Sequence, residues 1–462
     1  MNNCAMNEFV AVDNAGSIWT DSGNLIMNSV DVYDTTAVNG GFAFFTNAPT
    51  VSMDGVHVSR VVSSGEGGIY AETGSLTIEN SSFYNMTTLG QGGAMFAITL
   101  DVLDVSHSTF SECTSTASNG GAVSIATAST STTLGRGGSI FTVQLDTQLT
   151  ITDSEFDDHI AAVSGGTMFI ESGQILAQRS NISQSEAPLG GSVYAAVDTN
   201  AETEFDECFF SQSDATTTHG GVFFADFGAH TITKSDFNTY SALEHGGAIF
   251  ANQPTLLVQD CDFTTGSAVL GGALYFTNAN STLIDCSFNS HSASDRGGLA
   301  YFEHGETQFT RVQTAHSTAT NSAGALFVQD GIHHFVEYET TNSSSVLGGA
   351  AFLEGGDTTF TQCLFDDNQS TDDGAGVYID GGDHQFGETT FNNQRSQTDG
   401  GCVYTRSLGT IEFDQSLFTI STGARGAGVF VEQGTPLFTS SNITLNTVQL
   451  GGGFYVILED VN

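Results

Sequence analysis

The stretch that decides the fold is HGGAIFANQP, His245 to Pro254, which returns in modified form as GGALYFTNAN at Gly271 to Asn280. Both copies place two glycines before a small residue, an aliphatic residue and an aromatic residue. Recurrence of such a phrase at a fixed period is the signature of a repeat architecture.

The aromatic residue of this phrase marks a repeat that runs through almost the whole chain. From Phe224 onward it returns every 25 or 26 residues. Before Phe224 the spacing is looser, and one copy has Ser124 in place of the aromatic, so we expect an irregular coil or an insertion near residues 115–135. The marker aromatics are Trp19, Phe44, Tyr70, Phe96, Phe141, Phe169, Tyr194, Phe224, Phe250, Tyr275, Tyr301, Phe327, Phe352, Tyr378, Tyr404, Phe430 and Tyr455.

A second phrase lies between these markers, for example LTIENSSF ending at Phe83 and LLVQDCDF ending at Phe263. Both phrases are short, rich in β-branched and aromatic residues, and bounded by Gly, Asn, Asp, Ser and Thr, which is typical of strands and turns. No segment shows apolar residues at helical spacing over three turns. The sequence therefore predicts an all-β protein.

A unit of 25 or 26 residues with two or three short strands cannot bury its own apolar face, but stacked copies can. This length fits one coil of a parallel β-helix, whereas a leucine-rich repeat needs an L-x-x-L-x-L frame and a propeller needs longer blades. We expect a single right-handed parallel β-helix of roughly 18 coils over residues 16–462, with right-handed crossovers. Residues 1–15 are expected to form an N-terminal edge strand or to continue a longer chain.

The pattern leaves two directions open for the side chains of the glycine phrase. We expect Ile, Val and Leu of the glycine phrase to face inward and the marker aromatics to face outward, because the two sets alternate along the strand. Outward rings would form an apolar stripe suited to an interface; core packing of the rings is the alternative. The terminal Phe of the second phrase should be buried, together with the small residue two positions before it.

The GGA-[ILV] phrase, alternating with a Phe-containing strand, resembles the repeats of the chlamydial polymorphic outer-membrane proteins and related surface adhesins, which have a pectin-lyase-like right-handed β-helix. The resemblance covers essentially Gly16 to Val456. The family's second motif, F-x-x-N, is kept at Phe365 to Asn368, while other copies carry Ser or His in place of the Asn, as at His159, Ser213, His291 and Ser421. The resemblance implies surface display and adhesion or scaffolding, with no catalytic residues to carry over.

The chain is strongly acidic, with 52 Asp and Glu against 9 Lys and Arg and a net charge of −43. Such a field disfavours nucleic acid and anionic membranes as partners, and no apolar run is long enough to insert into a membrane. The first residues lack the basic start and apolar core of a signal peptide, so we expect a piece of a longer secreted chain, extracellular or at the cell surface. N-linked glycans are expected at the sequons Asn80, Asn85, Asn181, Asn280, Asn342, Asn368 and Asn442.

Cysteine chemistry contributes little to the functional prediction. There are seven cysteines and no C-x-x-C motif, which disfavours zinc and redox sites. Cys261 and Cys286 share one phase in adjacent coils, within reach of a disulfide. Parallel strands aim both Cβ atoms the same way, which favours thiols.

No catalytic or cofactor-binding constellation emerges from the sequence. Acid pairs such as Asp366-Asp367 fit solvated turns better than the spaced carboxyls of a glycosidase. Glu354 and Asp380 occupy one phase in neighbouring coils, so their carboxylates should either be solvated or bind calcium.

The first functional hypothesis is a non-enzymatic structural or adhesion protein, a filament-forming glycoprotein that binds glycans or its own copies. The alternative is a polysaccharide lyase or glycoside hydrolase of the pectin-lyase-like class. Since bare end coils expose strand edges, we expect Phe9, Val10, Phe454, Tyr455 and Val456 to be covered by adjoining chain or by a second copy stacked head to tail.

Overall fold

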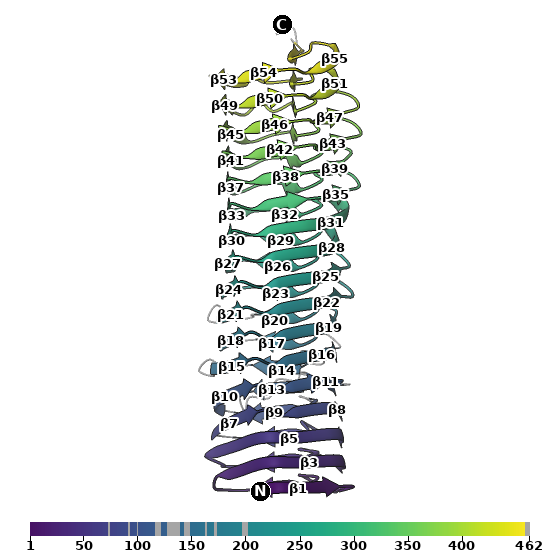
Figure 1. The fold of residues 1–462 in the computed structure, drawn as a ribbon, viewed down its shortest axis with the longest axis vertical. Coiled ribbons are helices and arrows are strands. Elements are labelled where there is room, and N and C mark those ends of the chain that lie inside the picture. The colour runs from purple at the N-terminus through teal and green to yellow at the C-terminus, as the bar shows by residue number, and fades with distance from the viewer. Residues whose placement is uncertain are drawn as a thin grey trace. The chain divides into compact units, whose positions relative to one another are not determined.

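The computed structural model describes residues 1–72, 74–90, 93–98, 100–115, 122–126, 139–142, 148–161, 164–170, 173–195 and 202–457. Its regular elements are β-strands, and they pair in parallel as a right-handed β-helix (Figure 1). The chain divides into two compact units, Met1–Ala242 and Leu243–Asn462. The structure has about 16 turns, close to the roughly 18 expected from the repeat spacing. The predicted fold class is confirmed.

The first unit contains β1 to β25. The strands that carry the glycine phrase are β2 (Ile18–Thr20), β4 (Ala43–Phe45), β6 (Ile69–Ala71), β9 (Met95–Ile98), β13 (Ala122–Ala126), β14 (Ser139–Thr142), β17 (Met168–Ile170), β20 (Val193–Ala195) and β23 (Phe223–Ala225). The other strands of this unit are β1 (Asn2–Asn7), β3 (Leu25–Ala37), β5 (Thr50–Ser63), β7 (Gly74–Glu79), β8 (Ser82–Thr88), β10 (Leu100–Ser106), β11 (Thr109–Ser111), β12 (Thr114–Ser115), β15 (Gln148–Thr152), β16 (Glu155–Ile160), β18 (Gln174–Gln178), β19 (Asn181–Ala187), β21 (Glu202–Asp206), β22 (Phe209–Ala215), β24 (Ala229–Thr233) and β25 (Asp236–Ala242).

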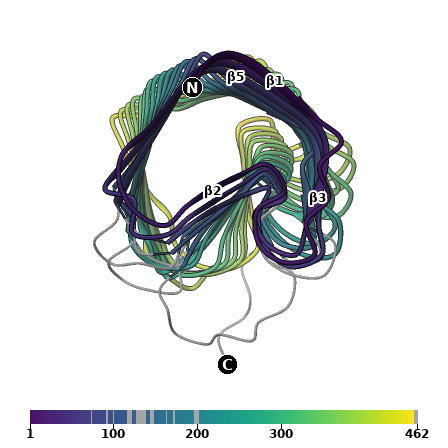
Figure 2. The same ribbon diagram turned by 90° about the horizontal axis from the view of Figure 1, so that it is seen from below.

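Two predictions about the first unit concern its irregular parts. Within residues 1–15, β1 pairs in parallel with β3. Most of the irregular coil predicted near 115–135 lies outside the described residues, but β13 within it pairs with β9 and β14. Figure 2 is a view from below, in the direction in which the strands stack. It shows β2 on the side of the coil opposite the labelled parts of β1 and β5.

The second unit contains β26 to β56. Its glycine-phrase strands are β26 (Ile249–Asn252), β29 (Leu274–Thr277), β32 (Ala300–Phe302), β36 (Leu326–Val328), β40 (Ala351–Leu353), β44 (Val377–Ile379), β48 (Val403–Thr405), β52 (Val429–Val431) and β56 (Phe454–Val456). The strands that follow them are β27 (Thr255–Gln259), β30 (Ala279–Ile284), β33 (Gly305–Thr310), β37 (Ile332–Val336), β41 (Asp357–Thr361), β45 (Asp383–Gly387), β49 (Ile411–Asp414) and β53 (Leu437–Thr439). The third side of each turn is formed by β28 (Asp262–Leu270), β31 (Ser287–Arg296), β34 (Gln313–Ala315), β35 (Thr318–Ala319), β38 (Glu339–Thr341), β39 (Ser344–Ser345), β42 (Leu364–Asp366), β43 (Gln369–Ser370), β46 (Thr390–Asn392), β47 (Arg395–Ser396), β50 (Leu417–Thr419), β51 (Thr422–Arg425), β54 (Asn442–Thr444) and β55 (Thr447–Leu450).

The two positions of the glycine pair require glycine for different physical reasons. Gly246, the first of its pair, has a φ of 63°, a backbone conformation that side chains disfavour. A Cβ on Gly246 would lie 2.4 Å from the carbonyl oxygen of Ile249. A Cβ on the second glycine, Gly247, would lie 2.0 Å from the carbonyl oxygen of Gly272 in the next turn. The first glycine therefore permits the turn, and the second permits the close stacking of turns.

Most of the marker aromatics that the structure describes are buried, so the outward apolar stripe favoured by the sequence is wrong. The exceptions are Trp19, which is 65% exposed, and Tyr194 and Tyr455, which are half-buried. In the second unit the rings form a continuous stack from Phe250 to Tyr455, and neighbouring centroids such as those of Tyr378 and Tyr404 lie 4.7 Å apart. The glycine turn folds back over this stack, and a Cβ on Gly297 would lie 3.3 Å from the Cβ of Phe327 in the next turn. The missing side chain thus leaves room for the carbonyl of Ala300 and for the Cβ of the marker residue in the next turn.

The second phrase behaves as predicted. Its terminal Phe residues are at most 2% exposed and stack along the inside of the coil, as in Phe365 on Phe391 at 4.9 Å. The small residues two positions earlier are also buried, and in the first unit Ser108 shows their role. Its hydroxyl donates to the carbonyl of Ser106 and accepts the backbone N–H of Ser81 from the preceding turn. These side chains therefore close backbone hydrogen bonds where the strand bends.

The F-x-x-N position is also an inward polar position. Asn368 is fully buried; its Oδ1 accepts the N–H of Ser343 at 2.9 Å and its Nδ2 donates to the carbonyl of Thr340 at 3.3 Å. Gln394 and Ser421 occupy the same place in the following turns and are equally buried. In these two turns another buried hydrogen-bonding side chain therefore replaces the Asn, whereas Met86 and Gly266 stand at this position in earlier turns.

Candidate functional site

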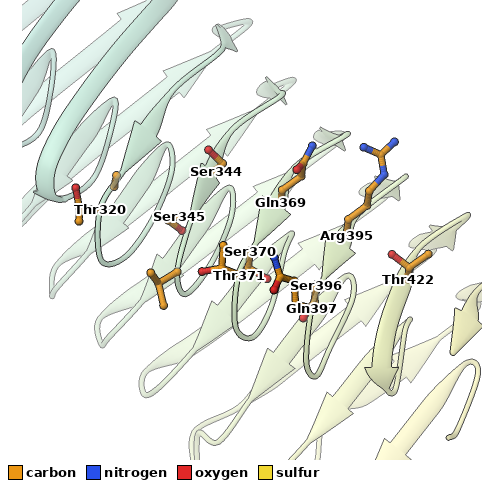
Figure 3. A pocket seen from close by; sticks show the side chains of 12 residues that line it. Thr320, Ser344, Ser345, Gln369, Ser370, Thr371, Arg395, Ser396, Gln397 and Thr422 are labelled. Atoms are coloured by element: carbon orange, nitrogen blue, oxygen red, sulfur yellow. The ribbon is translucent and has the colours of Figure 1, made fainter. Parts of the chain in front are cut away.

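A polar groove on the second unit is the candidate functional site. It has a volume of about 550 Å³ and runs over β35, β39, β43, β47 and β51. The first residues of the last four of these strands stand in register, Ser344 beside Gln369, Gln369 beside Arg395 and Arg395 beside Thr422. Figure 3 shows Gln369 and Arg395 extending from adjacent strands in this row. A second row, two positions further along each turn, consists of Thr320, Val346, Thr371 and Gln397.

The floor of the groove is a line of buried small residues between the two rows. Ser345, Ser370 and Ser396 are less than a tenth exposed. The hydroxyl of Ser345 donates to the carbonyls of Leu347 and Gly348, and that of Ser370 donates to the carbonyl of Asp372. Because these hydroxyls are held by the turn before the glycine pair, the floor is rigid and places the outer side chains at a fixed spacing.

The side chains that remain available in the groove are amides, hydroxyls and one guanidinium. Within the described part of the chain, the amides of Gln369 and Gln397 make no hydrogen bond, and both side chains are exposed. Arg395 lies 2.9 Å from Asp367 through Nη1, which leaves its other N–H groups for a ligand. The lining contains no carboxylate, although the whole chain carries 52 acidic residues.

The predicted calcium residues lie elsewhere, on the turns after the glycine-phrase strands. Asp380 accepts hydrogen bonds from Nε and Nη2 of Arg406, which lies one turn further on. Glu354 is exposed in the preceding turn. The cation that meets Asp380 in this structure is therefore a guanidinium. Two other acids of this phase accept hydrogen bonds from tyrosine hydroxyls, Glu303 from Tyr275 at 2.9 Å and Glu432 from Tyr404.

Arginine–aspartate pairs form a pattern that the sequence analysis missed. Several arginines bind an aspartate of the preceding turn, and Arg179 and Asp153 are joined at 2.8 Å between Nε and Oδ1. The signal was an aspartate 26 residues before an arginine. The pairs with this spacing are Asp34–Arg60, Asp153–Arg179, Asp285–Arg311, Asp380–Arg406 and Asp399–Arg425. Five of the nine lysines and arginines thus join neighbouring turns.

A recurring G-x-H sequence was also missed. His230, His333 and His384 are buried, and each ring donates through Nε2 to the carbonyl three residues earlier, for His384 that of Gly381 at 2.6 Å. Burial lowers the pKa of His384 to about 4. These histidines tie the turn and are not exposed to a ligand.

The sequons differ in exposure. Asn80, Asn85, Asn280, Asn342 and Asn442 are exposed, and Asn181 is half-buried. Asn368 is fully buried with both amide atoms bonded, so it has no room for a glycan in the folded chain.

The residues predicted to form interfaces are accessible at the two edges. In the first unit Phe9 is 44% and Val10 77% exposed. In the second unit Phe454 and Val456 are each 39% exposed, whereas Tyr455 is half-buried and stacks on Phe430 at 5.2 Å.

The cysteines form no disulfide. Cys286 lies beside Cys261, donates to the carbonyl of Ile284 at 3.3 Å and is buried. This outcome agrees with the preference for thiols.

No family model, no curated protein and no solved structure matches the chain. The described part of the chain contains no helix with the length and hydropathy of a membrane span. The fold and the groove must therefore support the functional argument by themselves.

Proposed function

We propose that this protein is a non-enzymatic structural and adhesion protein of the extracellular space or cell surface, similar to the polymorphic outer-membrane proteins and built on a pectin-lyase-like β-helix. The observation that carries the proposal is the groove, which offers binding groups in regular rows but no carboxylate. Hydrolysis of a glycosidic bond requires an acid and a base or nucleophile, in most enzymes two carboxyl groups. The groove is thus equipped to hold a ligand and lacks those groups.

The internal ladders support a scaffolding role. Stacked rings, buried amides and arginine–aspartate pairs each repeat from turn to turn within a unit. Repetition of this kind makes stability a sum of neighbouring contacts. It yields a rigid surface with fixed spacing, which suits display and attachment.

The other parts of the proposal concern the surroundings of the chain. We expect glycans at the exposed sequons, although no longer at Asn368. The edge residues Phe9, Val10, Phe454 and Val456 would be covered by adjoining chain or by a second copy stacked head to tail. The marker rings from Phe250 to Phe430 are buried, so they offer no aromatic stripe for lateral assembly. A calcium ion bound by Glu354 and Asp380 would compete with Arg406 for the Asp380 carboxylate.

The alternative function is a polysaccharide lyase or hydrolase acting in the same groove, with Arg395 as its only charged group. Incubating the purified chain with a panel of neutral and acidic polysaccharides separates the two. The proposal expects retention of at least one polymer and no new reducing or unsaturated ends. Turnover that Arg395→Gln abolishes would establish the enzyme instead. Labelling intact source cells with a membrane-impermeant reagent tests the surface location.

A further inference from the structure

We propose that the groove of the second unit binds an uncharged, linear polysaccharide that lies along the stacked turns. This inference rests on the proposed adhesive function and specifies its ligand. It follows from the spacing of the two rows, from the charge of the lining and from the state of the backbone beneath it.

The spacing favours a polymer with a short, regular repeat. Adjacent turns are separated by about 4.8 Å, so the groove from β35 to β51 is roughly 19 Å long. The three middle turns each present one side chain in each row, namely Ser344 with Val346, Gln369 with Thr371 and Arg395 with Gln397. A pyranose chain running along the turns would meet the same pair of positions at each sugar, because one sugar and one turn are comparable in length.

The chemistry of the lining favours hydroxyl groups as its complement. Amides and hydroxyls both donate and accept, as sugar hydroxyls do. The apolar side chains of the lining are Ala319 and Val346, so the groove offers little to an apolar ligand. An anionic polymer would have to approach a chain of net charge −43. A cationic ligand would find no carboxylate in the lining.

The backbone disfavours an extended peptide. A peptide that binds by strand addition needs free N–H and C=O groups at a sheet edge. Here the N–H of Gln369 donates to Ser343, that of Arg395 to Asn368 and that of Thr422 to Gln394, all in the preceding turn. Only side chains are left to recognise a ligand, and they lack the apolar pockets that distinguish one peptide from another.

The test is a binding titration of the full chain with neutral oligosaccharides, namely cello-, manno-, xylo- and chito-oligosaccharides of two to eight sugars. Polygalacturonate and an unstructured peptide library serve as competing classes. At least one neutral series should bind saturably, with affinity that rises with length until the groove is spanned and is flat beyond. Absence of saturable binding in every neutral series, or binding of only the acidic polymer or the peptides, would overturn the proposal.

Variants locate the ligand. Gln369→Ala and Arg395→Gln should each weaken binding roughly 2- to 12-fold, the equivalent of one hydrogen bond. The matched controls Gln385→Ala and Arg311→Gln change the same residue types on exposed strands or turns outside the groove and should leave affinity unchanged. Equal loss in groove and control variants, or no loss in either, would also refute the site. Thermal unfolding of each variant confirms that it is folded.

The outcome also separates this inference from the proposed function. If the chain binds neutral glycans in the groove but cleaves them, the ligand is right and the non-enzymatic function is wrong. If the chain attaches to cells equally well with and without the groove variants and binds no neutral glycan, adhesion stands and the groove is not its site.

Discussion

Mild acid should destabilise this protein through its buried histidines, and His384 allows the effect to be measured at one position. Its imidazole is buried in the second unit with Nε2 bonded to a carbonyl, while Nδ1 has no hydrogen-bond partner in the described structure. Burial lowers its pKa from 6.5 to about 4. His333, in the same register two turns earlier, has a pKa of about 4 for the same reason.

The sign and size of the effect follow from linkage. The unfolded chain takes up a proton as the pH falls through 6.5, while the folded chain does so only near 4. Stability conferred by the neutral ring is therefore present above pH 6.5 and is lost as the pH falls toward 4. Between pH 7 and pH 5 one such histidine should lower the free energy of unfolding by about 2 kcal/mol. Most carboxylates stay ionised in this window, so the histidines dominate it.

The assay is thermal unfolding by circular dichroism at pH 7 and pH 5, for the native chain and for His384→Thr. Threonine is the residue that stands beside His384 in the preceding turn, at Thr358. The native chain should melt at a lower temperature at pH 5, and the variant should lose roughly 4–8 °C less between the two pH values. His334→Thr, which replaces an exposed ring on the outer face, is the matched control and should behave as the native chain.

A melting temperature that does not change between pH 7 and pH 5 would contradict the reasoning. So would a His384→Thr variant whose pH dependence equals that of the native chain, because a purely structural role would lower stability at both pH values alike.

Three other perturbations test the ladders. Gly246→Val should destabilise the second unit by about 2–4 kcal/mol through a disfavoured φ and a clash with the carbonyl of Ile249. Ala323, whose φ is 61°, occupies the first-glycine position of its own turn. Ala323→Gly should therefore raise the free energy of unfolding by up to about 1 kcal/mol. In urea unfolding, Gly246→Val must lower the free energy of unfolding and Ala323→Gly must raise it. Asn368→Ala should cost about 1–3 kcal/mol, because it leaves the buried N–H of Ser343 without its partner. Peptide mass spectrometry of native material should find Asn368 unmodified, and a glycan there would mean that the residue is exposed in the mature protein.

The fold was predictable because its two phrases carry their physical reasons in the sequence. In the glycine phrase, the first glycine has a positive φ and the second has no space for a Cβ. A short strand follows them, and few architectures bury such a strand. The period of 25 or 26 residues then sets the length of a turn. The buried Phe of the second phrase followed from alternation along the strand.

The direction of the marker rings was not predictable in the same way. Alternation indicates two faces but not whether the second face is covered, and all three residues of β44, Val377 to Ile379, are buried. The cover comes from the glycine turn, whose path over the rings depends on the tertiary structure. The groove was also invisible, because Ser, Thr and Gln at exposed positions are unremarkable in sequence. It exists only where two-residue strands such as β43 and β47 stack in register.

The most direct test of the whole account is a single calorimetric titration of the purified chain with the neutral oligosaccharide that binds it best, followed by mass analysis of the recovered ligand. We expect saturable heat, a stoichiometry of one ligand per groove and an oligosaccharide recovered at its original length. A shortened or unsaturated oligosaccharide, or no heat with any neutral oligosaccharide, would contradict it.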